Sequence, residues 1–258
     1  MSGVTSGKVD LHVDGSAMPA FTYWPEGRPE GSGPWPAVIV VQEIFGVNDD
    51  IKGFASRIAE AGYFAVAPDM YHRAGYNVVV SYGPDRERAR GLRSQVSADH
   101  IVADLNATVA YLQGDAHVDA DRIGIVGFCF GGMVSYLAAA RVPGIKAAAV
   151  YYGGEIVPRP DAPPGTPSLL DETAADVRCP IIGFWGDQDH LIPVESVRKI
   201  EAVLRAAGKS IDNHIYAGAG HGFVWEDRPG HHEAGTRDAW SRTLGFFATH
   251  LAQPARVS

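Results

Sequence analysis

The chain has 258 residues, of which 46% are hydrophobic and 20% charged, and its formal net charge is -8 at pH 7. This length and composition fit one large α/β domain with a substantial buried core better than two small domains. No apolar run is long enough to span a membrane, the first ten residues lack the pattern of a secretory signal, and the negative charge opposes non-specific binding to nucleic acid. We therefore expect neither a membrane nor a nucleic acid as partner.

The N-terminal segment, residues 1–36, predicts an antiparallel edge of the sheet and a connector. Lys8–Val13 and Ala20–Trp24 have the composition of short strands, and the Asp14-Gly15 pair between them favours a turn. A Pro/Gly-rich connector, Pro25–Pro36, then leads into the core of the same domain.

Residues 37–258 predict the α/β core. The run Ala37–Val41 is continuously apolar and rich in β-branched residues, as expected of a strand covered on both faces. Strands and helices alternate after it, which implies a mostly parallel sheet of about eight strands with helices on both faces. The further elements we expect are helix Asp50–Ala61, strand Tyr63–Ala67, helix Ser97–Leu112, strand Ile123–Gly127, helix Met133–Ala140, strand Lys146–Tyr152, strand Pro180–Trp185, helix Val194–Ala207, strand Ile211–Tyr216 and helix Glu233–Leu251.

Two stretches have no regular pattern, Asp69–Gln95 and Gly153–Asp176. Each follows a predicted strand, so each should lie at the carboxyl edge of the sheet, where open α/β folds bind ligands. They are either pocket walls or plain surface loops, and the sequence favours neither.

The segment Gly127–Gly132 has the pattern of a nucleophile elbow, G-x-C-x-G, with Cys129 at its centre. The central residue of such a strand-to-helix turn is strained, and small neighbours let the strand and the helix approach each other. A buried structural cysteine in a glycine-rich turn is the alternative.

The other cysteine, Cys179, precedes a predicted strand and is expected in the core. Two cysteines cannot form a disulfide framework, and a nucleophilic thiol needs a reducing environment, so we expect a cytoplasmic protein.

Two later motifs follow Cys129 in the chain order nucleophile, acid, histidine that is typical of α/β-hydrolases. Asp187 and Asp189 directly follow a predicted strand, and we prefer Asp189 as the acid because it lies further into the turn; one or both could simply cap the next helix. His221 follows the last predicted strand in a glycine-rich turn. The pair His231-His232 could suggest a metal site, but it lacks other well-spaced ligands and fits a helix start better. We expect no metal and no organic cofactor.

These residues predict a Cys-His-Asp triad. Asp189 would orient His221, His221 would take the thiol proton, and the sulfur of Cys129 would attack a carbonyl carbon to form an acyl-thioester that water hydrolyses. The backbone N–H groups of Phe130 and Ile44 are the expected donors to the oxyanion.

The chain resembles the dienelactone hydrolase family from about Ala37 onwards. The resemblance is carried by five motifs: Gln42-Glu43-Ile44-Phe45-Gly46-Val47-Asn48, Ala67-Pro68-Asp69-Met70-Tyr71, the segment Gly127–Gly132, Gly186-Asp187-Gln188-Asp189-His190 and Ala219-Gly220-His221-Gly222-Phe223. It implies an α/β-hydrolase fold, a triad of Cys129, Asp189 and His221, and a role for Glu43 as acceptor of the thiol proton. A structural hydrogen bond to the backbone is the alternative for Glu43.

One departure from the family pattern concerns substrate binding. The resemblance implies two arginines that hold a substrate carboxylate, the first of which maps to Arg86, although Arg88 or Arg90 would also fit. At the second position this chain has Trp225, which cannot replace a guanidinium in binding a carboxylate and instead suggests a substrate with an aromatic or apolar part. Apart from one pocket residue, we expect the arginines around Arg86 to form a solvated helix face.

The sequence thus predicts a hydrolase that cleaves an ester or lactone, possessing the features of a carboxymethylenebutenolidase but with an altered anion site. A catalytically inactive small-molecule-binding protein on the same fold is the alternative. A redox-active thiol is disfavoured because its resolving partner would have to be Cys179. A monomer and a homodimer remain equally open.

Overall fold

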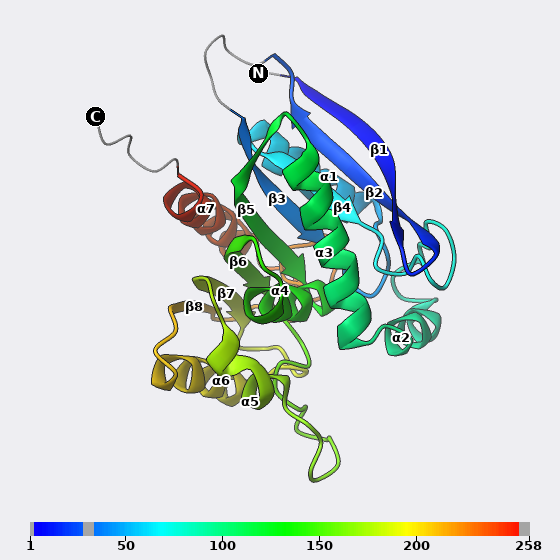
Figure 1. Cartoon of the computed structure of the whole chain (residues 1–258). Helices are drawn as coiled ribbons and strands as arrows, with labels where there is room; N and C mark the ends of the chain where they lie inside the picture. Colours follow the sequence, from blue (N-terminus) through cyan, green and yellow to red (C-terminus); the bar gives the residue numbers. More distant parts are fainter. Residues whose placement is uncertain (1–2, 28–33, 253–258) are drawn as a thin grey trace, which may run out of the picture.

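All the strands of the computed structural model, which describes residues 3–27 and 34–252, lie in one sheet (Figure 1). The predicted connector Pro25–Pro36 falls partly outside the described residues. The strands are β1 (Val4–Val13), β2 (Ser16–Pro25), β3 (Trp35–Val41), β4 (Phe64–Pro68), β5 (Val118–Phe128), β6 (Ile145–Tyr151), β7 (Ile181–Gly186) and β8 (Ile211–Tyr216). Their order across the sheet is β1-β2-β4-β3-β5-β6-β7-β8.

The sheet is antiparallel at one edge and parallel everywhere else. β1 pairs with β2 and β2 with β4 in antiparallel register, whereas the six strands from β3 to β8 pair in parallel. This confirms the predicted α/β class and the antiparallel N-terminal edge. The turn at Asp14-Gly15 is also confirmed, since both residues have positive φ. β1 and β2 are longer than predicted. Their backbone pairing continues into segments such as Val4–Gly7, in which apolar and polar side chains do not alternate and so give no strand signal.

Helices cover both faces of the sheet, as predicted. α3 (Ala98–Gly114), α4 (Phe130–Arg141) and α6 (Val194–Ala206) lie on the face turned to the viewer in Figure 1. α1 (Asp49–Glu60) and α7 (Glu233–His250) cover the other face, where Phe54 of α1 packs edge-on against Trp240 of α7.

Three short helices lie in the stretches that the sequence predicted to be irregular. They are α2 (Arg86–Ser94), α5 (Leu169–Thr173) and the 3₁₀ helix η1 (Ala174–Asp176). α2 agrees with the helix face expected around Arg86, but its bounds could not be predicted because its single buried residue, Ala89, leaves no apolar stripe to recognise. α5 and η1 are too short to show a periodic pattern.

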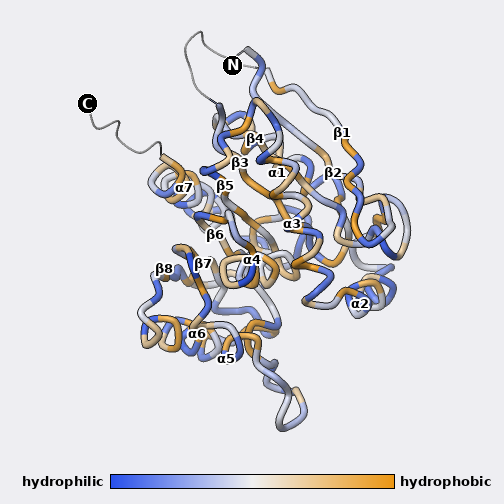
Figure 2. The backbone as a smooth tube through the Cα atoms, viewed as in Figure 1, coloured by the Kyte–Doolittle hydropathy of each residue, from blue (hydrophilic) through white to orange (hydrophobic). Residues whose placement is uncertain are grey.

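The central parallel strands contribute many fully buried apolar residues to the core, and Figure 2 shows these strands as largely hydrophobic. The segment Ala37–Val41 of β3 is fully buried, as its β-branched composition predicts. Every parallel strand ends at the same edge of the sheet, and the loops that follow these ends carry the predicted site residues. Within the part of the chain described, no helix has the length and apolar character needed to cross a membrane.

Candidate active site

Cys129 occupies a strained strand-to-helix turn between β5 and α4. Its backbone angles are φ 54° and ψ -110°, a region that residues other than glycine rarely adopt. Its flanking glycines are required by space, because a Cβ on Gly127 would lie 2.1 Å from the carbonyl oxygen of Gly131, and one on Gly131 would lie 2.4 Å from that of Val41. The side chain is only partly buried. The turn therefore has the backbone geometry of a nucleophile elbow and presents the thiol at the carboxyl edge of the sheet.

His221 and Asp189 form a hydrogen-bonded pair beside Cys129. Nδ1 of His221 lies 2.7 Å from Oδ2 of Asp189, and Oδ1 of Asp189 accepts hydrogen bonds from the backbone N–H groups of Leu191 and Ile192. Asp187 instead accepts from the backbone N–H of Gly218. Of the two aspartates that the sequence left open, the structure brings Asp189 to the histidine.

The environment of His221 favours its protonated form. Burial lowers the pKa of the ring, but the neighbouring Cys129 and Asp189 raise it by more, so the pKa of His221 lies well above its ordinary value. Nε2 makes no hydrogen bond of good geometry to any described residue. This atom is therefore available to exchange a proton with the thiol or with a substrate.

The two predicted oxyanion donors are joined by one buried tyrosine. The Tyr71 hydroxyl donates to the carbonyl oxygen of Ile44 at 3.1 Å, and the Tyr71 ring stacks on that of Phe130 with 6.2 Å between centroids. The backbone N–H groups of Ile44 and Phe130 have no acceptor among the described residues. Tyr71 thus fixes both segments while their N–H groups stay free.

Glu43 follows β3 and is only 5% exposed. Burial raises the pKa of its carboxyl group, and the nearby charges of His221 and Arg228 offset this only in part. Nη2 of Arg228 lies 3.8 Å from Oε2 of Glu43 and 3.1 Å from Oδ2 of Asp50, while the guanidinium stacks on Tyr82 at 3.7 Å. Glu43 is therefore a buried acid with a raised pKa, which suits a group that exchanges a proton.

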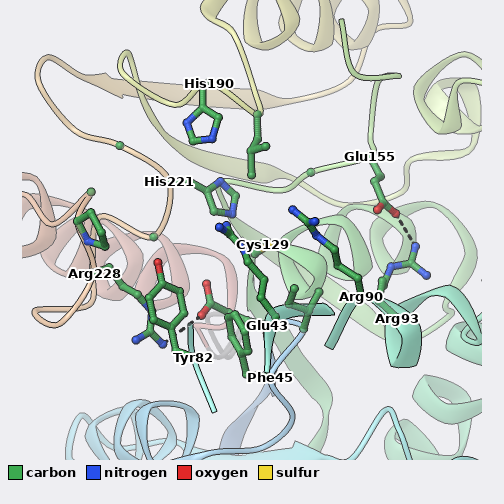
Figure 3. Close-up of a pocket in the computed structure, with 18 of the residues that line it drawn as sticks. Glu43, Phe45, Tyr82, Arg90, Arg93, Cys129, Glu155, His190, His221 and Arg228 are labelled. Atoms are coloured by element: carbon green, nitrogen blue, oxygen red, sulfur yellow. Dashed lines mark hydrogen bonds and ion pairs between the residues drawn. The ribbon is translucent and has the colours of Figure 1, made fainter. Parts of the chain in front are cut away.

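A cavity of about 650 Å³ opens over these residues (Figure 3). Its lining includes Glu43, Ile44, Cys129 and His221 together with five arginines. These five are Arg86, Arg90, Arg93, Arg159 and Arg228. The predicted Arg86 thus lines the cavity, and so do Arg90 and Arg93, whereas Arg88 does not. The expectation that only one arginine of this cluster faces the pocket is wrong, because these three share one face of the helix.

Trp225 does not line the cavity, contrary to the substrate-binding role predicted for it. Its ring packs against Phe54 and Phe128, with centroids 6.5 Å and 4.9 Å apart. Its indole N–H also lies close enough to Glu43 to lower the pKa of that carboxyl group. The residue that lines the cavity on this side is Arg228, three positions further along the chain.

Comparison with known proteins places this site in a family. The family model described as "Dienelactone hydrolase family" matches residues 21–251. The chain belongs to the dienelactone hydrolase family. It is 35% identical to the "Putative carboxymethylenebutenolidase" of Methylorubrum extorquens, over 95% of this chain and 81% of that protein. It is 37% identical to the protein of the same description from Escherichia coli strain K12, over 95% and 87% of the two chains.

Solved structures of this hydrolase family share the fold. The crystal structure described as "Putative Dienelactone Hydrolase from Klebsiella pneumoniae subsp. pneumoniae" superposes with a TM-score of 0.84 at 33% identity, and the match covers 95% of this chain and 99% of that one. The dienelactone hydrolase-like phosphotriesterase P91 superposes with a TM-score of 0.80 at 22% identity, covering 96% and 99% of the two chains, a likeness that concerns the fold alone.

Two residues that were expected to lie outside the site, Cys179 and His232, have the structural roles predicted for them. Cys179 is buried in the core, and burial raises its pKa to about 12. His232 caps the N-terminus of α7 by accepting a hydrogen bond from the backbone of Gly235 at 3.0 Å, which confirms the helix-start interpretation. Sequence reasoning missed Tyr71 and Arg228. The only signal for Tyr71 was its place in one of the motifs that carry the family resemblance. Arg228 had no signal, because it does not lie at the position where the family has its second substrate-binding arginine.

Proposed function

We propose that this chain hydrolyses an ester or lactone through Cys129, His221 and Asp189. The observation that carries the proposal is the strained backbone of Cys129 in a cavity that also contains His221, itself hydrogen-bonded to Asp189. A protein that merely bound small molecules would have no use for this conformation, which costs about 1–3 kcal/mol. The strain therefore favours an enzyme over the inactive binding protein.

In the acylation step, the thiol proton of Cys129 passes to a base while the sulfur attacks the carbonyl carbon of the substrate. Nε2 of His221 is the base supported by its hydrogen bond to Asp189 through Nδ1. The resemblance to the family makes Glu43 the first acceptor when substrate arrives, and Glu43 must then pass this proton to His221 before the leaving group departs. The carbonyl electrons move to oxygen, where the N–H groups of Ile44 and Phe130 would stabilise the negative charge. The C–O bond then breaks, and the leaving oxygen takes its proton from His221.

The deacylation step repeats these movements with water as nucleophile. Water gives a proton to His221 as its oxygen attacks the thioester carbon. The C–S bond then breaks to release the acid, and the sulfur of Cys129 regains its proton from His221. In this scheme the raised pKa of His221 lets the ring hold the proton within each step, and the ring is neutral between the two steps.

The substrate class is an acidic ester or lactone. Two relatives are described as a carboxymethylenebutenolidase, and one from Bradyrhizobium, 33% identical over 94% of each chain, as "Probable 2-oxo-3-(5-oxofuran-2-ylidene)propanoate lactonase". These names describe lactones with a carboxylate. The position of Arg86 in the cavity lining supports the same class for this chain.

The test is hydrolysis of 4-nitrophenyl butanoate and of neutral and carboxylated butenolides by the purified protein. We expect Cys129→Ala to lose turnover of all of them and Cys179→Ala, which changes a buried thiol outside the cavity, to retain it. Trapping by mass spectrometry should detect an acyl group on Cys129 during turnover. Full activity of Cys129→Ala would disprove the proposed mechanism.

A further inference from the structure

Two arginines in the cavity have no ion partner among the described residues, Arg86 and Arg90. They stand four residues apart on α2, so they lie on the same face of that helix. The other three cavity arginines are each paired with a carboxylate. These pairs are Arg93 with Glu155 at 2.6 Å, Arg159 with Asp161 at 3.2 Å and Arg228 with Asp50 at 3.1 Å.

The charges that line the cavity therefore leave a surplus of two positive charges. Glu155 is matched by Arg93, and Glu43 is a buried carboxyl whose charged form is disfavoured. Figure 3 shows Arg90 reaching into the cavity beside Cys129, while Arg93 turns towards Glu155. The unpaired guanidinium group of Arg90 thus points to the space that a substrate must occupy, and Arg86 lines the same cavity.

Both arginines are exposed to solvent, and their positions on α2 are slightly unfavourable electrostatically. Arg86 is the first residue of α2, where the helix dipole disfavours a cation, and Asp85 at the N-cap makes no capping hydrogen bond with its side chain. Two like charges four residues apart on a helix also repel each other. Such a conflict between local sequence and local structure is expected where a residue serves binding rather than folding.

We propose that Arg86 and Arg90 together hold two anionic groups of the substrate, so that the preferred ester or lactone carries two carboxylates. A dianion would neutralise the surplus charge and would also meet the favourable N-terminal end of α2. The cavity has room for such a molecule, because its volume of about 650 Å³ falls within the range of about 300–1,000 Å³ of sites for ligands larger than a simple lactone. This inference rests on the proposed hydrolase function and assigns Arg90 as the second arm of an anion site built on one helix.

The experiment compares three 4-nitrophenyl esters with the same leaving group and increasing charge. They are the butanoate, the monoester of glutaric acid and the terminal monoester of propane-1,2,3-tricarboxylic acid, which carry no, one and two carboxylates. After subtraction of the spontaneous rate, kcat/KM should rise with each added charge. We expect Arg86→Gln and Arg90→Gln each to lower the ratio of kcat/KM for the doubly charged ester to that for the neutral ester by at least about tenfold, the effect of one lost charge-assisted hydrogen bond.

Arg88→Gln is the matched control, because Arg88 lies on the same helix but outside the cavity lining. It should leave this ratio within about twofold of the wild-type value, the scatter expected of a surface change. Equal preference for the singly and doubly charged esters, or an equal loss in Arg88→Gln, would overturn the inference.

A binding measurement separates this inference from the hydrolase proposal. Calorimetric titration of Cys129→Ala with glutarate and with butanoate needs no turnover. Tighter binding of glutarate that disappears when Arg90→Gln is added supports the anion site even if no ester is hydrolysed, in which case only the proposed reaction fails. Binding of glutarate no tighter than that of butanoate would overturn the anion site, whatever the activity.

Discussion

Replacing Tyr71 by phenylalanine tests whether one side chain organises the oxyanion site. The substitution removes the hydroxyl that donates to the carbonyl oxygen of Ile44 at 3.1 Å and leaves the ring that stacks on Phe130. Tyr71 is 1% exposed, so water cannot readily take the place of the lost donor. The peptide that contains the Ile44 carbonyl is then free to tilt. Because the N–H groups of Ile44 and Phe130 would act together on one oxygen atom, a shift of the Ile44 segment weakens the oxyanion site even though the Phe130 donor stays in place.

The expected size of the effect follows from two limits. Leaving a buried carbonyl without its donor costs about 1–3 kcal/mol of stability. Complete loss of one oxyanion donor lowers kcat by about 10²–10³, but Tyr71→Phe only loosens a donor that is still present. We therefore expect kcat to fall by about tenfold, which corresponds to about 1.4 kcal/mol, with KM changed by less than about twofold because the donors act on the transition state.

Tyr136→Phe provides the matched control. Tyr136 is also 1% exposed, and its hydroxyl accepts a hydrogen bond from Thr173 at 3.1 Å, but it does not line the cavity. Both variants should lower the thermal midpoint by a similar amount, and only Tyr71→Phe should lower kcat. The reasoning is refuted if both variants have the kcat of the wild type, or if both lose activity in proportion to stability.

Three further predictions concern the acid, the buried glutamate and the two thiols. Asp189→Asn should lower kcat by about 10³–10⁴, because the amide would hold the wrong tautomer of His221. Asp187→Asn should lower kcat by less than about tenfold, and equal losses for the two variants in steady-state assays would contradict the assignment of Asp189 as the acid. Burial raises the pKa of Glu43 above its ordinary value of 4.5, so the folded state binds more protons than the unfolded state between the two values, and wild-type stability falls as pH rises through that window. Glu43→Gln should therefore gain stability relative to wild type from about pH 4.5 upwards in urea titrations, and a stability difference that does not change with pH would refute the raised pKa. Iodoacetamide should label Cys129 and spare the buried Cys179 in the folded protein, as read by peptide mass spectrometry. Labelling of both thiols at a similar rate would contradict the assignment of Cys179 to the core.

The parts of the fold that the sequence predicts well are those with a strong local signal. The continuous apolar run Ala37–Val41 identifies a buried parallel strand, and the glycine spacing around Cys129 identifies the turn that the structure contains. The Asp189–His221 contact joins loops far apart in the chain, yet it is predictable because parallel strands bring their carboxyl ends to one edge.

The features that the sequence did not predict depend on tertiary contacts without a local pattern. A helix face was expected at the arginines of α2, but hydrophobic periodicity could give neither its bounds nor the side that faces the cavity, because the helix has a single buried residue. The family position suggested that Trp225 binds substrate, but the loop instead packs the indole on Phe54 and Phe128 and brings Arg228 towards Glu43. Counting residues from a motif cannot reveal which side chain of a bending loop faces the cavity.

Backbone strain gives an independent argument for where the chemistry takes place. Five described residues other than glycine have positive φ, and two of them, Asp14 and Asn77, are of the types that tolerate this conformation in turns. The other three, Cys129, Tyr152 and Glu155, follow β5 and β6 at the same edge of the sheet. Each is held by a contact across that edge: the backbone N–H of Cys129 donates to Tyr151, that of Tyr152 donates to Phe184, and the carboxylate of Glu155 pairs with Arg93. Backbone strain of about 1–3 kcal/mol per residue persists only where the surrounding structure enforces it. In this protein the contacts that enforce it lie at the edge of the sheet that presents the thiol, the ring of His221 and the cavity.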